Sequence, residues 1–183
     1  MTTIISIKGK NERMGRLFKT PKHNLLYKGR TALEQTIEYM SQFGEVKVMT
    51  HENSPPDTGI VDMLLQMDLP DQFFVVDCDV IPIRITKYGN DRPVVYCFEN
   101  KAGLGCYSNF DVDEKTGIVN QCNEKGEVFK WAGGGVYYFS NPDQVKKFPE
   151  CKSLAEIMSK QRTLADTTSE IFRFGSLQTI LNG

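Results

Sequence analysis

The chain has 183 residues, of which 40% are hydrophobic and 25% are charged, a balance typical of soluble globular proteins. Its formal net charge is −1, so overall electrostatics do not favour binding to nucleic acid or to an anionic membrane. The longest apolar runs, such as FFVV, are too short to span a bilayer, and the N-terminus lacks the apolar stretch of a secretory signal. We therefore expect one cytoplasmic domain over residues 1–183, with no membrane or nucleic-acid partner.

The first 80 residues alternate between strand and helix patterns. Thr31 and Glu34 form a capping box that opens an amphipathic helix ending at Gly44, whereas residues 8–30 are expected to form an irregular basic loop. The predicted elements of this half are strands 2–7, 45–50 and 71–77 and helices 31–44 and 58–67. Strands that alternate with helices in this way predict right-handed crossovers and a parallel sheet.

The second half consists mainly of short strands separated by turns. The predicted elements are strands 92–98, 106–113, 117–123 and 134–140 and helices 141–148 and 153–161, followed by a strand and a helical turn at the C-terminus. The chain as a whole is therefore expected to be an α/β protein with a mostly parallel central sheet and an antiparallel extension.

The five cysteines are odd in number and widely spaced, at positions 78, 97, 106, 122 and 151. No C-x-x-C pair occurs and the chain has two histidines, a pattern that argues against a structural zinc site. Reduced thiols in the cytoplasm are the simplest interpretation.

Two acidic residues follow the third predicted strand, in the segment VVDCDVI. Asp77 and Asp79 are two residues apart, so an extended backbone would direct both carboxylates to the same side. Such a pair suits a hard divalent cation, Mg²⁺ or Mn²⁺, that bridges to substrate phosphates. The alternative is a solvated strand end with two acidic residues.

The basic loop after the first strand supplies the opposite charge. In an open parallel sheet both segments would lie beyond the carboxyl ends of the strands, where ligands bind. Gly9 allows the backbone to approach a ligand closely, and the cations that could meet phosphate oxygens are Lys8, Lys10, Arg13, Lys19 and Lys22. Carboxylates that hold a metal and face cations that hold phosphates are what phosphoryl or nucleotidyl transfer requires.

Three segments, in order, resemble the sugar-phosphate nucleotidyltransferase family. The loop is similar to its signature L-A-x-G-x-G-[ST]-R-[ML]…P-K-x-L, FFVVDCDVI to its strand that ends in a metal-binding Asp, and NEKGEVFKWAGGGVYYFSNP to its E-K-P…N-[AG]-G-[IV]-Y-x-F stretch. The resemblance implies a GT-A-like three-layer αβα sandwich and Mg²⁺-dependent transfer of a nucleoside monophosphate from an NTP to a sugar 1-phosphate or a similar phosphorylated alcohol, with release of pyrophosphate.

The same resemblance implies roles for individual residues. Arg13 and Lys22 would act on the triphosphate and the reacting phosphates, and Asp79, together with Asp77, would hold Mg²⁺. The residues expected to contact the nucleotide are Lys8, Gly9, Lys10, Asn11, Glu12, Thr58 and Gly59, and those expected to contact the substrate are Glu124, Lys125 and Gly134. A homodimer is left open.

The chain departs from the family pattern at several positions. Asn11 replaces the second glycine of the signature, and Glu12 replaces the usual Ser or Thr. At the C-terminus, Arg173 stands where the family has a second metal-binding Asp, so Asp77 or Asp166 would have to supply the missing carboxylate.

Several related functions therefore stay open. The base loop and the D-x-D segment are similar to the choline-phosphate cytidylyltransferase branch, and RMG is similar to the molybdopterin-type guanylyltransferases. A GT-A glycosyltransferase would use D-C-D as its metal motif but would leave the basic signature without a role. A catalytically inactive sugar-nucleotide-binding homologue is the third class.

Overall fold

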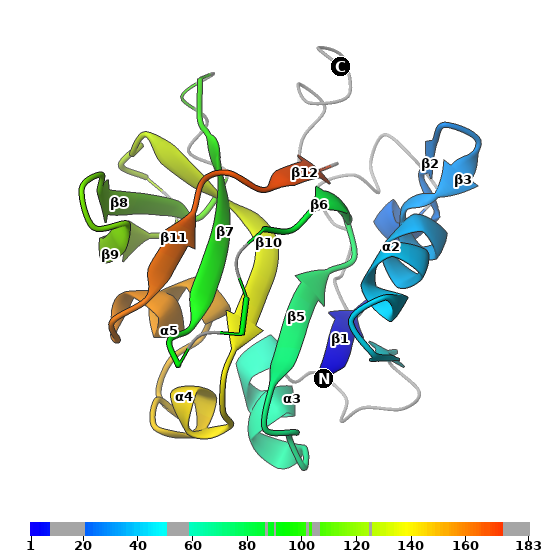
Figure 1. Ribbon diagram of the computed structural model, residues 1–183, viewed down its shortest axis with the longest axis horizontal. Coiled ribbons are helices and arrows are strands. Elements are labelled where there is room, and N and C mark those ends of the chain that lie inside the picture. The colour runs from blue at the N-terminus through cyan, green and yellow to red at the C-terminus, as the bar shows by residue number, and fades with distance from the viewer. Residues whose placement is uncertain are drawn as a thin grey trace.

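The computed structural model describes residues 1–7, 21–50, 59–86, 88–89, 91–101, 103, 107–124 and 126–173. Within these residues an eight-stranded sheet runs in the order β4-β1-β5-β10-β7-β11-β9-β8 (Figure 1). Its strands are β1 (Thr2–Ser6), β4 (Glu45–Met49), β5 (Phe73–Asp77), β7 (Val94–Glu99), β8 (Asn109–Asp113), β9 (Ile118–Asn123), β10 (Trp131–Phe139) and β11 (Leu164–Asp166).

The parallel part of the sheet forms as predicted, since β1 pairs in parallel with both β4 and β5. Beyond β5, however, β10 runs antiparallel to both β5 and β7, and β7 is parallel to β11. The sheet is therefore mixed rather than mostly parallel. The reason is topological: its central strand β10 comes from the turn-rich second half of the chain, which also supplies the strands beyond it.

The second half of the sheet closes on itself. β8 pairs antiparallel with β9 along its length and also pairs with β10 at Trp131 and Ala132. Because β11 joins β7 to β9, the strands β10, β7, β11, β9 and β8 form a closed ring. The predicted antiparallel extension is thus a curled sheet rather than a flat continuation.

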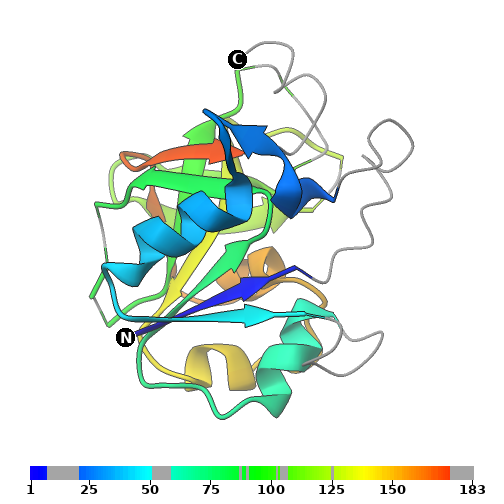
Figure 2. The same cartoon turned by 90° about the vertical axis from the view of Figure 1, so that its right-hand side faces the viewer.

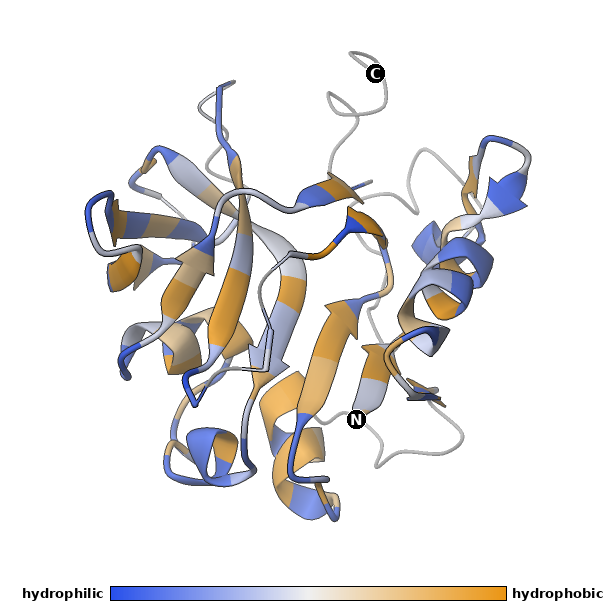
Figure 3. Ribbon diagram, in the orientation of Figure 1, coloured by the Kyte–Doolittle hydropathy of each residue, from blue (hydrophilic) through white to orange (hydrophobic). Residues whose placement is uncertain are grey.

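Helices cover both faces of the sheet (Figure 2). Along β5, Phe74 and Val76 pack in the cluster that includes Met40 of α2, whereas Phe73 and Val75 pack in the cluster that includes residues of α3 and α5. β5 is hydrophobic on both faces, and its ribbon is orange along most of its length (Figure 3). The helices are α2 (Ala32–Ser41), α3 (Ile60–Gln66), α4 (Asp143–Lys146) and α5 (Leu154–Ser159).

Two small sheets lie beside the main sheet, and of their four strands the sequence predicted only the one near the C-terminus, at residues 170–173. β6 (Val80–Arg84) pairs with β12 (Glu170–Arg173), and its Pro82 is tolerated because the pair is only two strands wide. Part of the expected basic loop is also ordered, as the 3-10 helix η1 (Lys22–Asn24) and the hairpin of β2 (Leu26–Tyr27) and β3 (Arg30–Thr31). Stacking of Tyr27 on Phe172, with ring centroids 4.3 Å apart, joins this hairpin to β12.

No helix in the described part of the chain is long and apolar enough to cross a membrane. Of the five cysteines, Cys106 lies outside the described residues, and the other four are free thiols: Cys78, Cys97, Cys122 and Cys151.

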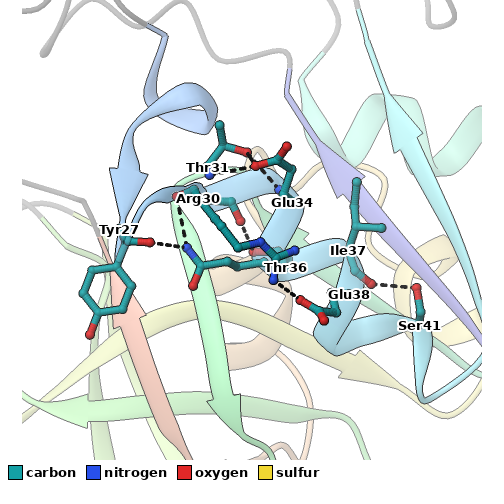
Figure 4. A network of polar contacts seen from close by, with 10 residues as sticks. Tyr27, Arg30, Thr31, Glu34, Thr36, Ile37, Glu38 and Ser41 are labelled. Atoms are coloured by element: carbon teal, nitrogen blue, oxygen red, sulfur yellow. Dashed lines mark hydrogen bonds and ion pairs between the residues drawn. The ribbon is translucent and has the colours of Figure 1, made fainter.

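The predicted capping box of α2 is present (Figure 4). Thr31 Oγ1 accepts a hydrogen bond from the Glu34 backbone N–H at 3.1 Å, and the Glu34 carboxylate accepts one from the Thr31 N–H at 2.9 Å. Gln35 then donates to the Tyr27 carbonyl at 2.7 Å, which attaches the hairpin to the helix. The helix itself ends at Ser41, three residues before the expected stop at Gly44.

Removal of this cap is expected to weaken the fold. Thr31→Ala should lower the free energy of unfolding by about 1 kcal/mol, because the first turn of α2 loses a side-chain acceptor. Thr31→Ser keeps the hydroxyl and serves as the control in urea unfolding. An equal loss in both variants would contradict a role for the hydroxyl.

Asp166, at the end of β11, is a fully buried carboxylate that holds the connection to β12. It accepts hydrogen bonds from Thr168 N–H at 2.9 Å, from the Thr86 hydroxyl at 2.9 Å, and from the Thr168 and Ser169 hydroxyls. Burial alone would raise the pKa of Asp166, but these hydrogen bonds outweigh it and lower the pKa. Asp166 is thus engaged in this connection, which does not support the expectation that it supplies a second metal carboxylate.

A pH-dependent stability follows from the lowered pKa of Asp166. The ionised group stabilises the fold above the ordinary pKa of an Asp, and this contribution disappears as the pH falls through the lowered value. Asp166→Asn should therefore cost about 2 kcal/mol at neutral pH and progressively less in acid. Unfolding measured from neutral to acidic pH, with the exposed Asp143→Asn as control, tests this expectation. A cost that does not change with pH would contradict it.

Candidate functional site

The candidate site lies at the carboxyl edge of the parallel strands. Ser6, at the end of β1, is in register with Met49 of β4 and with Asp77 of β5. The strands β1 and β5 therefore end side by side at this edge of the sheet. Residues 8–20 of the basic loop lie outside the described residues.

β5 ends at Asp77, and the next two residues form the turn that leads into β6. The expectation of an extended backbone through Asp79 is thus wrong, because the chain reverses here to enter the small second sheet. Cys78 is half-buried between the two acids, and burial, followed by the charges of Asp79 and Asp77, raises the pKa of its thiol to about 12. This thiol is not activated as a nucleophile.

Two cations face the two carboxylates. Lys22 Nζ lies 2.9 Å from Asp79 Oδ2, and Arg173 Nη2 lies 2.9 Å from Asp77 Oδ2. Arg173 Nε lies 3.8 Å from Asp79 Oδ1, so the guanidinium contacts both acids. We refer to Lys22, Asp77, Asp79 and Arg173 as the ion cluster.

The residues of the ion cluster come from η1, from β5 and the turn that follows it, and from β12. Arg173 lies opposite Val80 in the β12–β6 pair, which sets it beside Asp79, and Lys22 is the first residue of η1. Arg173 Nη1 also donates to the Gly133 carbonyl of β10 at 2.8 Å, and its guanidinium lies 5.5 Å from the ring centroid of Tyr107. The arginine is therefore fixed by contacts with three different segments besides the acids.

The pKa values of the two acids are shifted in opposite directions. Burial, with a smaller contribution from Asp79, raises the pKa of Asp77 to about 6, and the charge of Arg173 only partly offsets this. Burial also opposes ionisation of Asp79, but Arg173 and Lys22 together outweigh it and lower the pKa of Asp79. The pKa of Arg173 is raised, since its burial is outweighed by Asp79 and Asp77. Asp79 and Arg173 are thus both charged at neutral pH.

The two carboxylates predicted to hold a metal ion are paired with cationic side chains. Within the described residues no group of three or more His, Cys, Asp or Glu could hold a metal ion on protein ligands alone, whereas Mg²⁺ needs only one or two carboxylates when water and substrate phosphates complete its shell. The oxygens of the acid pair already accept hydrogen bonds from Lys22 and Arg173 at 2.9 Å. Arg173, the residue that replaces the expected second Asp, is the cation that lies between them.

The other predicted site residues are distributed as follows. Gly59 is exposed at the N-cap of α3, beyond the carboxyl end of β4. Glu124 is exposed after β9, where it accepts a hydrogen bond from the Ser153 hydroxyl, and its charge contributes to the raised pKa of Asp77. Those outside the described residues are Lys8, Gly9, Lys10, Asn11, Glu12, Arg13, Thr58 and Lys125.

Gly134 lies inside β10 rather than in a turn, at a bulge between Gly133 and Tyr137 where the register with β7 shifts. A Cβ on Gly134 would lie 2.8 Å from Ile171 Cδ1 and 2.9 Å from the Tyr96 carbonyl oxygen. Packing against β12 and β7 therefore accounts for this glycine, and its contact with a substrate stays a prediction.

Gly135 is a further residue of the site, which the sequence marks only as a member of the glycine triplet at 133–135. Its φ is +75°, and a Cβ would lie 2.8 Å from Asp77 Oδ2 and 2.7 Å from Val80 Cγ2. The glycine thus lets β10 pass directly over the carboxylate of Asp77. The triplet of glycines is the only sequence signal for this, and it does not say which carboxylate lies underneath.

Gly135→Ala is expected to displace Asp77 and to destabilise the fold. Gly29→Ala is a matched control, because Gly29 has a similar φ of +79° but nothing within 4 Å of the added Cβ. Gly135→Ala should therefore lower the free energy of unfolding by about 2 kcal/mol more than Gly29→Ala, owing to overpacking. Equal effects in denaturant unfolding would show that backbone strain alone is responsible.

The fold is similar to that of several solved structures. HddC from Yersinia pseudotuberculosis is 16% identical, with a TM-score of 0.70 over 99% of this chain and 96% of that chain. The nucleoside-diphosphate-sugar pyrophosphorylase from Vibrio cholerae is 14% identical, with a TM-score of 0.67 over 100% and 98%. The CTP:phosphocholine cytidylyltransferase from Streptococcus pneumoniae is 12% identical, with a TM-score of 0.68 over 99% and 96%.

By sequence, no family model matches the chain, and no curated protein matches it significantly. The structural likeness nevertheless extends over nearly the whole chain. The protein therefore has the mixed α/β fold of sugar-phosphate nucleotidyltransferases.

Proposed function

We propose that the protein is a nucleotidyltransferase that binds an NTP at the carboxyl edge of β1, β4 and β5 and transfers its nucleoside monophosphate to a small phosphorylated acceptor. A phosphate oxygen of the acceptor would form a bond to the α-phosphorus, and the bond between the α- and β-phosphates would break to release pyrophosphate. The observation that carries this proposal is the position of Lys22, whose Nζ lies beside Asp79 at the end of β5.

Several features support the proposal. Lys22 belongs to the P-K-x-L part of the nucleotidyltransferase signature, and its side chain is only 17% exposed, so its charge is little screened by water. Arg13 belongs to the sequence segment that follows β1, and the last residue of β1, Ser6, is in register with Asp77. The reaction brings phosphate groups together, and these cations would offset a repulsion of several kcal/mol per pair of charges a few ångströms apart.

The fold also suggests where the acceptor would bind. Glu124, which the resemblance assigns to the substrate, is close enough to Asp77 to influence its pKa. A sugar 1-phosphate or a phosphorylated alcohol is the class of acceptor that we propose for this side of the site.

One observation favours a second candidate function. Arg173 occupies the acid pair, so the site could bind a sugar nucleotide without turnover. The glycosyltransferase alternative would need D-C-D as a metal motif, and the pairing of both acids with cations does not favour that use.

Calorimetry with ATP, CTP, GTP, UTP and dTTP, with and without Mg²⁺, tests the proposal, followed by assays for pyrophosphate release with phosphocholine and a panel of sugar 1-phosphates. We expect one NTP to be selected and pyrophosphate to be released with one class of acceptor. Binding of an NDP-sugar without turnover would favour the second candidate. Absence of binding by any NTP or NDP-sugar would contradict both.

Lys22→Ala should weaken NTP binding by about 1.5–3 kcal/mol, because a charge-assisted contact with phosphate is lost. Lys101→Ala is the matched control, since Lys101 is 82% exposed and pairs only with the nearby Glu99 among the described residues. Equal affinities of the two variants, measured by calorimetry, would remove Lys22 from the phosphate site.

A further inference from the structure

The guanidinium of Arg173 takes the space between the two acids of the ion cluster. A divalent cation that bridged Asp77 and Asp79 would have to lie within about 2–2.6 Å of their oxygens. Arg173 Nη2 lies 2.9 Å from Asp77 Oδ2, and Nε lies 3.8 Å from Asp79 Oδ1. We propose that Arg173 replaces a divalent cation at this acid pair, so that Asp77 and Asp79 bind no metal ion of their own.

Arg173 is held in place and is not a surface arginine that can readily turn away. Its side chain is 18% exposed, and its Nη1 donates to the Gly133 carbonyl at 2.8 Å. The guanidinium also lies over the ring of Tyr107, and the backbone is paired with Val80 in the β12–β6 sheet. Withdrawal of the side chain to admit a metal ion would break both the hydrogen bond to Gly133 and the contact with Tyr107.

The charge balance of the cluster also disfavours a metal ion. Two carboxylates face two cations, so the cluster is neutral when all four groups are ionised. A divalent ion at the acids would be close to both Lys22 and Arg173, and like charges at such distances repel strongly in a partly buried site. The charge that the metal would supply is already supplied by the protein.

The remaining hydrogen-bonding capacity of Arg173 points the same way. Its Nε is buried and makes no hydrogen bond within the described residues. An N–H group of this kind can donate a hydrogen bond to an oxygen of an anionic ligand, but it cannot coordinate a cation. Whether the acid pair binds a divalent cation does not depend on the reaction that the site performs, so the proposal can be tested without a nucleotide.

The test is a titration of the full chain with Mn²⁺ at neutral pH, without nucleotide, in which free Mn²⁺ is followed by electron paramagnetic resonance. We expect the wild-type protein to bind no Mn²⁺ at the acid pair. Arg173→Ser should tighten Mn²⁺ binding at least about tenfold, because a positive charge is removed from the site. Asp79→Asn introduced into Arg173→Ser should abolish the gain.

Arg84→Ser is the matched control. Arg84 lies on β6 of the same small sheet and forms an exposed ion pair with Glu170, so its loss should not change Mn²⁺ binding. Binding of Mn²⁺ by the wild-type protein that disappears in Asp79→Asn would overturn the proposal, as would a folded Arg173→Ser that gains no Mn²⁺.

Circular dichroism shows whether Arg173→Ser is folded. If Arg173→Ser does not fold, titrations of the wild-type protein and of Arg173→Lys with Mn²⁺ test the proposal instead. Arg173→Lys keeps the positive charge and should bind no Mn²⁺, whereas tight binding by either protein would overturn the proposal. Failure of nucleotide binding would count against the proposed function alone, since this titration contains no nucleotide.

Discussion

The end of β5 imposes the constraint on which the site depends. A strand buried on both faces delivers two carboxylates to the edge of the sheet, and charged groups in such a place must be paired. Lys22 and Arg173 provide the pairing, and they come from segments on opposite sides of β5 in the sequence. The ion cluster therefore ties η1 and β12 to the central sheet.

A second feature of the ion cluster is that both acids are paired with cations of the same chain. In this chain the end of β5 lies beside the end of β1. In this chain the acids at that position are neutralised internally, so their role changes from attracting a cation to positioning two cationic side chains. Phosphate groups remain the ligands for which such cations are suited.

Packing around the site leaves little freedom for these side chains. Gly135 allows β10 to cross directly over Asp77, and Gly134 allows Ile171 of β12 to approach β10. Arg173 is thereby held between β10 and the β5–β6 turn. Glycines that look like a flexible or ligand-binding motif in the sequence thus serve the close approach of three strands.

The sequence by itself determined the features that depend on neighbouring residues: the buried strand β5, the capping box of α2, and an acid pair at a strand end with a basic segment after β1. Tertiary structure decided the rest. β10 entered the centre of the sheet, β8 closed the ring, and Arg173 met Asp77 across 96 residues of sequence. These contacts are non-local, so no spacing in the sequence specifies them, and the resemblance that marked Arg173 as a departure could not show that it pairs with both acids.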